Sequence, residues 1–178
     1  MSKKAKIILV VPLVGGLAWL AFGFFGIQAL WTNREVEEEI PDSVSELISQ
    51  PAGAAGTGLV GTGLFEQGDS TYTIAGNVFL SRTEGKLHLT FTDFEVSNGP
   101  DLFVYAVKTN STDNRTVKDT VANGGFVNLG ALKGNLGNQS YLLEDEINAD
   151  EYSVIAIWCR RFSRNFGSAA LSPPTSGS

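Results

Sequence analysis

Residues 152–162, Tyr-Ser-Val-Ile-Ala-Ile-Trp-Cys-Arg-Arg-Phe, are the most hydrophobic of the strands that the sequence predicts. Side chains of an extended strand alternate between its two faces. Here the even and the odd positions each carry an apolar set: Val154, Ala156 and Trp158, and Ile155, Ile157 and Cys159. Because both faces are apolar, we expect a central strand that is covered on both sides. The strand leaves the core after Cys159, where arginines follow.

Further strands are predicted on either side of this one in the chain. The clearest is 86–94, in which Leu87, Leu89 and Phe91 alternate with polar residues. The others, which are separated by turns rich in Gly and Asn, are 71–80, 102–108, 125–129 and 140–143. No segment after residue 58 has a sustained helical period. The sequence therefore predicts an all-β domain over 58–171, an antiparallel β-sandwich or a barrel, followed by a flexible tail at 172–178.

The N-terminal region predicts a membrane segment. A basic stub, residues 1–6, holds three lysines, and residues 7–31 carry no charge. A transmembrane helix needs roughly 20 such residues. The lysines place the N-terminus in the cytoplasm and the β domain outside it. The resulting expectation is one N-terminal transmembrane helix, a signal-anchor that binds the lipid bilayer. The alternative is a signal peptide cleaved near Ala29, although the apolar regions of such peptides span only about 7–15 residues.

Residues 32–57 read as a linker that is first acidic and then rich in Gly and Ala. In its first part, apolar residues recur four positions apart, which predicts a short amphipathic helix interrupted by Pro41. These residues are Val36, Ile40, Val44 and Ile48.

Composition excludes several function classes. The formal net charge is −6, so clustered basic residues of the kind that bind nucleic acid are not expected. One cysteine, Cys159, and one histidine, His88, exclude internal disulfides and multi-histidine metal sites.

His88 alternates with Leu87 and Leu89, which indicates a residue on the solvent face without a chemical role. The oxygen-bearing side chains around one turn could bind Ca²⁺ or serve turn chemistry alone; they are Asp93, Glu95, Asn98 and Asp101.

Cys159 is the residue whose chemistry stands out. Arg160 and Arg161 follow it directly, and nearby guanidinium groups lower a thiol pKa and increase its reactivity. Trp158 is expected to pack the end of the strand. The residues leave four alternatives open: an inert buried thiol, a redox-active thiol, a cofactor ligand, or intermolecular pairing.

Several short motifs occur in the order of one known domain. They are Gly63-Leu-Phe65, Gly76, Thr92-Asp-Phe94, Asn98-Gly-Pro-Asp101 through Tyr105, Leu129-Gly-Ala-Leu-Lys-Gly-Asn135, Gly137-Asn-Gln-Ser-Tyr141, and Ile157-Trp-Cys159 through Phe162 and Phe166. Over residues 58–171 the chain resembles the DM-thirteen electron-transfer domain. This family occurs in bacterial exported proteins and beside DOMON domains in animals.

The resemblance implies a β-rich extracytoplasmic module in which Cys159 acts in electron transfer, as a naked thiol or as the ligand of a prosthetic group such as haem. Family members often carry histidine where this chain has Tyr72 and Phe103. Without these histidines the chain lacks the natural second axial ligand of a haem, which weakens the alternative of a haem ligated by Cys159. A naked thiol would need a redox partner protein or a small thiol, because the chain has no second cysteine. The alternative is a non-catalytic surface module with an inert cysteine.

Overall fold

The computed structural model describes residues 14–16, 19, 33–40, 44–45, 58–143 and 147–173. The chain divides into two compact units, Met1–Thr32 with Asn98–Pro100, and Asn33–Ser97 with Asp101–Ser178. The predicted membrane segment 7–31 lies outside the described residues, apart from the helical residues 14–16 and Trp19. Within the described ranges, no helix has the length and hydrophobicity that crossing a bilayer requires.

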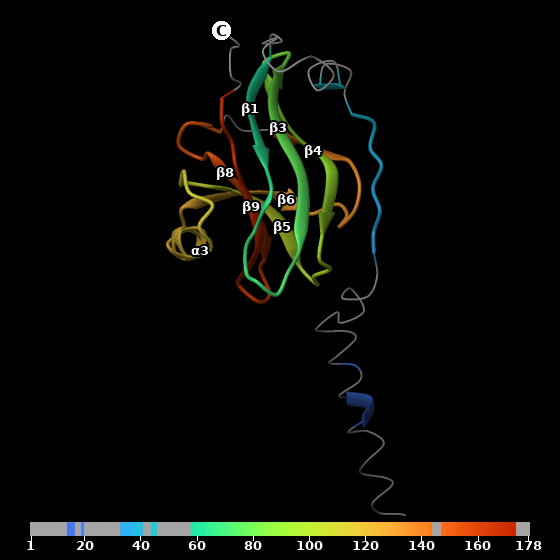
Figure 1. Ribbon diagram of the computed structural model, residues 1–178. Coiled ribbons are helices and arrows are strands. Elements are labelled where there is room, and N and C mark those ends of the chain that lie inside the picture. Colours follow the sequence, from blue (N-terminus) through green and yellow to red (C-terminus); the bar gives the residue numbers. More distant parts are fainter. Residues whose placement is uncertain are drawn as a thin grey trace, which may run out of the picture. The chain divides into compact units, whose positions relative to one another are not determined.

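The second unit is a sandwich of two antiparallel sheets (Figure 1). The first sheet has the order β1 (Leu59–Leu64), β3 (Ile74–Thr83), β4 (Lys86–Val96) and β7 (Gln139–Leu143). The second has the order β2 (Glu66–Gln67), β9 (Arg164–Ala170), β8 (Val154–Cys159), β5 (Leu102–Val107) and β6 (Phe126–Ala131). All six predicted strands are present, and the predicted antiparallel β-sandwich is confirmed. Sequence reasoning missed β1, β2 and β9.

The main core lies between the sheets. It is built from alternate side chains of facing strands, such as Leu89 of β4 and Ile157 of β8, and from an aromatic cluster in which Phe65 packs edge-on against Phe91 at 5.1 Å. The two faces of β8 divide as predicted. Ile155, Ile157 and Cys159 belong to this core, whereas Val154, Ala156 and Trp158 belong to a second cluster on the outer face.

A helix, α3 (Asn114–Ala122), covers that outer face. Its first turn is capped by Asp113, whose side chain accepts a hydrogen bond from the Thr116 N–H at 2.9 Å. Val117 and Val121, four residues apart, pack against the sheet. The prediction that no helix follows residue 58 was wrong. A helix of nine residues with two buried valines is too short to show a recognisable helical pattern in the sequence. The two-sided apolar strand already required a cover, and α3 provides it.

The segment 33–40 is extended and hydrogen-bonded to the domain (light blue in Figure 1). The Val36 N–H donates to the Leu136 carbonyl at 2.9 Å, and the Glu38 N–H donates to the Asn138 carbonyl at 3.0 Å. The predicted amphipathic helix is therefore wrong over these residues. A spacing of four is a multiple of the strand period as well as close to one helical turn, so Val36 and Ile40 also share a face in an extended chain.

Candidate functional site

Cys159 lies at the end of β8, between Leu102 of β5 and Arg164 of β9, and its side chain points into the main core with no exposed surface. Burial raises the pKa of the thiol, against an opposing effect of hydrogen bonds from the backbones of Phe162 and Arg161. The net pKa is higher than that of an ordinary thiol, so the sulfur is protonated at neutral pH.

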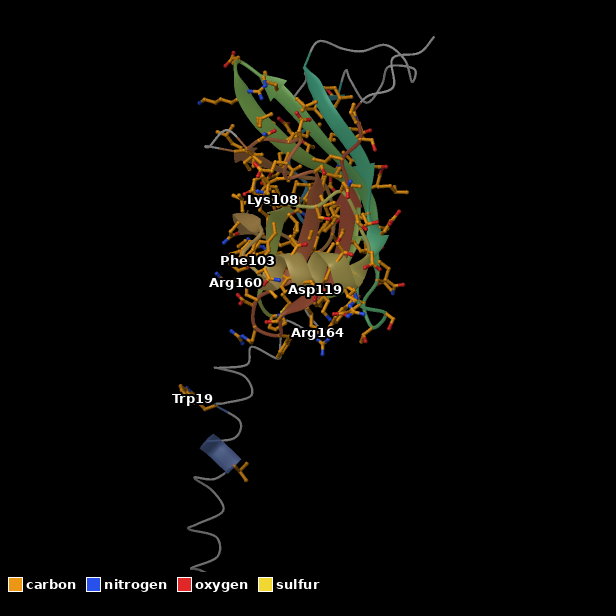
Figure 2. All side chains as sticks on the ribbon, turned by 90° about the vertical axis from the view of Figure 1, so that its left-hand side faces the viewer. Trp19, Phe103, Lys108, Asp119, Arg160 and Arg164 are labelled. Carbon is orange, nitrogen blue, oxygen red and sulfur yellow. The ribbon has the colours of Figure 1, made fainter. Side chains whose placement is uncertain are left out.

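The expected stabilisation of a thiolate by guanidinium groups is therefore corrected. The Nη2 atom of Arg160 lies 3.3 Å from Asp101 Oδ1, and the guanidinium carbon of Arg160 lies 3.6 Å from the centre of the Phe103 ring. Figure 2 shows Phe103 and Arg160 together on the side of the domain that carries α3. Arg161 is exposed, and the part of it that lowers the Cys159 pKa is its backbone. Neighbours along a strand face opposite ways, so closeness in sequence did not bring charge to the sulfur.

Trp158 faces the outer side of the sheet and is almost completely buried there. Its ring stacks on Tyr105 with centroids 6.2 Å apart and planes 18° apart. It packs the end of β8, as predicted, but on the side of the sheet away from Cys159.

The residues present do not fit haem. A haem iron held by cysteine needs open space beside the sulfur for the iron and the macrocycle, whereas the Cys159 side chain is packed in the main core with no exposed surface. Tyr72 stacks flat on Phe166, with centroids 3.7 Å apart, and Phe103 lies under Arg160. Both positions are thus occupied by side chains that pack against neighbours.

Of the two alternatives for the turn with Asp93, Glu95, Asn98 and Asp101, the Ca²⁺ site finds no support. In the part of the chain that the structure describes, no group of three or more His, Cys, Asp or Glu side chains could hold a metal ion. The Asp101 carboxylate binds Arg160 instead. His88 is half-buried on β4, between Ser81 of β3 and Leu142 of β7.

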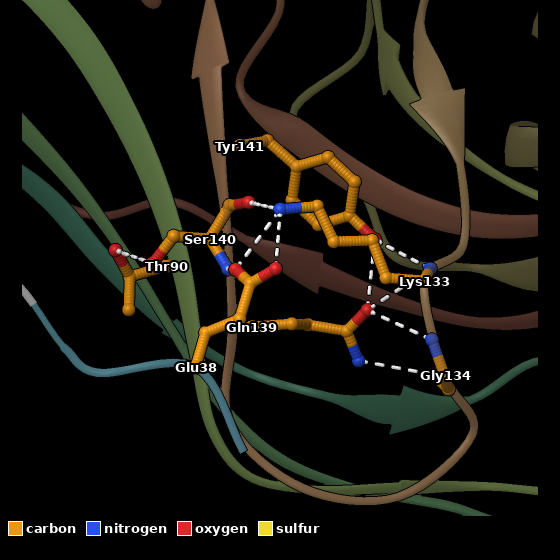
Figure 3. Close-up of polar contacts among 7 residues, drawn as sticks. All are labelled: Glu38, Thr90, Lys133, Gly134, Gln139, Ser140 and Tyr141. Carbon is orange, nitrogen blue, oxygen red and sulfur yellow. Dashed lines mark hydrogen bonds and ion pairs between the residues drawn. The ribbon is translucent and has the colours of Figure 1, made fainter. Parts of the chain in front are cut away.

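A polar network that sequence reasoning missed holds the loop 131–139 (Figure 3). The Lys133 ammonium binds Glu38 Oε1 at 2.7 Å and donates to the Ser140 carbonyl at 2.5 Å. The buried Gln139 Oε1 accepts hydrogen bonds from the Tyr141 hydroxyl at 2.8 Å and the Lys133 N–H at 3.2 Å. Burial alone would raise the pKa of Glu38, and the hydrogen bonds from Lys133 and Ser140 outweigh it, so the carboxylate stays ionised.

This network explains two of the motifs that carry the family resemblance, the ones at 129–135 and 137–141. Gly137 has φ +92°, and a Cβ there would collide with the Val36 carbonyl oxygen of the segment that crosses it. Lys133 binds Glu38 of the same segment, and Gln139 accepts a hydrogen bond from the Lys133 N–H. The residues of these two motifs therefore serve the fold, and Cys159 remains the chemically distinctive member of the set.

A family model described as electron transfer DM13 matches residues 65–171, which is more than half of the chain. No curated protein and no solved structure matches the sequence. The match begins at Phe65, directly after β1, and runs through β9, with Cys159 and the motifs described above from Phe65 onwards. The chain belongs to the electron transfer DM13 family.

Proposed function

We propose that this chain is a membrane-anchored, extracytoplasmic electron-transfer domain whose redox group is the Cys159 thiol. Family membership supports the electron-transfer role. The uncharged run 7–31 after three lysines supports an anchor in the lipid bilayer with the N-terminus in the cytoplasm. The proposed electron acceptor is a redox partner protein that carries a disulfide.

The observation that carries the role of Cys159 is the arrangement of the turn after β8. The turn 160–163, in which Ser163 has φ +51°, places the backbones of Phe162 and Arg161 near enough to the sulfur to lower the thiol pKa against the effect of burial. Backbone donors near a sulfur stabilise negative charge on it. This supports a thiolate that forms at the sulfur during reaction. The exposed turn 160–163 separates the sulfur from solvent, and we infer that its opening admits a partner.

The chemistry is thiol–disulfide exchange. After the turn opens and the thiol loses its proton, the Cys159 thiolate attacks one sulfur of the partner's disulfide. A mixed disulfide forms, and the partner's other sulfur leaves as a thiolate. A small thiol then attacks the mixed disulfide at the Cys159 sulfur, which frees the partner as a dithiol and leaves Cys159 disulfide-bonded to the small thiol. A second small thiol releases Cys159, and the two small thiols leave joined as a disulfide. Arg160 and Arg161 flank the opening, and Trp158 anchors the strand beneath it.

Maleimide labelling tests this mechanism on the intact full-length protein. We expect slow labelling that accelerates with pH above the range of an ordinary thiol, because the pKa is raised. The Asp101 charge contributes to raising it, so Asp101→Asn should label faster at a given pH. Cys159→Ala shows the background from other groups. A thiol that stays unlabelled at every pH until the protein is denatured would rule out the mechanism.

The complete burial of Cys159 favours a second candidate, a non-catalytic surface module in which this residue only packs the core. Cys159→Ala separates the two. Under the first proposal, reduction of a partner disulfide is abolished. Under the second, the variant only loses about 1–2 kcal/mol of stability through the small cavity left behind.

A further inference from the structure

A pocket of about 450 Å³ opens beside α3, on the outer face of the second sheet. Its walls include Tyr105 of β5, Phe126 of β6 and Trp158 of β8, together with Val121 and Ala122 of the helix. Small-molecule sites typically measure about 300–1,000 Å³. Figure 2 looks onto this side of the domain, where Asp119 marks the helix and Arg160 the neighbouring strand end.

Three aromatic rings from neighbouring strands form one wall of this pocket. Tyr105 lies in the middle, stacked on Phe126 at 4.3 Å and on Trp158 at 6.2 Å, with interplanar angles of 18° in both pairs. Because the rings support one another across three strands, the wall is apolar and rigid. Such a wall suits a flat ligand better than a flexible chain.

Two hydrogen-bond donors in this wall have no acceptor in the protein. Tyr105 and Trp158 are 4 % and 6 % exposed. In the part of the chain that the structure describes, neither the Tyr105 hydroxyl nor the Trp158 indole N–H is hydrogen-bonded to a protein group. Neither atom is among the fully buried atoms without a partner, so both keep access to water in the pocket. Both side chains line the pocket, so a ligand that carries acceptor atoms can replace that water.

The charged residues of the pocket are paired. Lys118 and Arg160 line it, each paired with a carboxylate, Asp69 and Asp101, and the lining residue Asp119 pairs with Arg115 at 3.8 Å. An aromatic cage can also hold a quaternary ammonium ion, which makes choline the competing probe for this pocket. Acceptor oxygens on a flat ring system are compatible with the cations, the unpartnered donors and the stacked wall.

We propose that this pocket binds a planar aromatic compound with carbonyl oxygens, of the quinone class. The carbonyl oxygens accept hydrogen bonds from Tyr105 and Trp158, and the ring system packs against Phe126 and the end of α3. The site lies on the face of β8 opposite to Cys159. It does not depend on thiol chemistry.

Calorimetric titration of the full-length protein with two matched probes tests the proposal. Anthraquinone sulfonate has the proposed carbonyl oxygens, and anthracene sulfonate has the same ring skeleton and charge without them. We expect the quinone to bind roughly tenfold or more tightly than the hydrocarbon, because two hydrogen bonds distinguish them. Equal affinities, or binding of choline in preference to the quinone, would overturn the proposal.

Variants locate the binding. Tyr105→Phe and Trp158→Phe each remove one donor and should weaken quinone binding roughly three- to tenfold. Tyr152→Phe is the matched control outside the pocket and should bind as the parent does. Ala122→Trp fills the pocket from the exposed end of α3 and should abolish binding. Cys159→Ala should retain it, which separates this site from the proposed thiol function. Quinone affinity unchanged in both Tyr105→Phe and Ala122→Trp would place the ligand elsewhere.

Discussion

Replacing Gln139 by Leu removes the centre of the polar network in Figure 3 without changing the side chain's size much. The Lys133 N–H retains a second acceptor, the Tyr141 oxygen at 3.1 Å. Three groups lose their partner: the Tyr141 hydroxyl proton, the Gly134 N–H and the Gly134 carbonyl. A buried polar group without a partner costs about 1–3 kcal/mol. Taking the lower half of that range for each group, we expect a loss of about 3–6 kcal/mol.

Urea denaturation of the full-length protein, followed by tryptophan fluorescence, measures this loss as a shifted midpoint at an unchanged slope. Gln67→Leu is the matched control, because its exposed amide binds the Tyr72 carbonyl where water can replace it. That variant should lose no more than about 1 kcal/mol. Tyr141→Phe should lie between the two. If Gln139→Leu costs no more than Gln67→Leu, the network does not hold the loop.

Three further predictions concern α3 and its surroundings. Val117→Ala should reduce the free energy of unfolding by about 1.5–3 kcal/mol, because two methyl groups leave a fully buried site; a loss no larger than that of the exposed Arg115→Ala would contradict the packing described. Asp113→Ala should cost about 0.5–2 kcal/mol and Asp113→Asn much less, since the amide oxygen can still cap the helix; denaturation midpoints decide. Burial raises the pKa of Asp69, but hydrogen bonds from Asn114 and Lys118 outweigh it and lower the pKa below 3.8. Its stabilisation is therefore complete above pH 3.8 and is lost as the pH falls through the lowered value. Melting temperatures between about pH 5 and pH 2 should fall less steeply in Asp69→Asn than in the parent.

The strands could be predicted because alternation with period two is a local property of the chain. In β4 and β8 it identified both the element and the faces of its side chains. The helix α3 escaped detection because its stability comes from two valines that meet the sheet and from one capping aspartate. The segment 33–40 was predicted to be helical, because its pattern fits both the helical and the strand period. Only its hydrogen bonds to residues 136 and 138 decide between the two.

For the candidate site, the sequence alone established one cysteine at the end of a central strand, followed by arginines. Only the tertiary structure decided the state of that cysteine. The strand directs Cys159 into the core and Arg160 to the opposite face, so desolvation, and not guanidinium charge, controls the thiol pKa. Likewise, Tyr105, Phe126 and Trp158 come from three separate strands and become one pocket wall only through sheet pairing. A sequence pattern reports which face a side chain takes, whereas pKa values and pockets depend on atoms that meet only after the chain has folded.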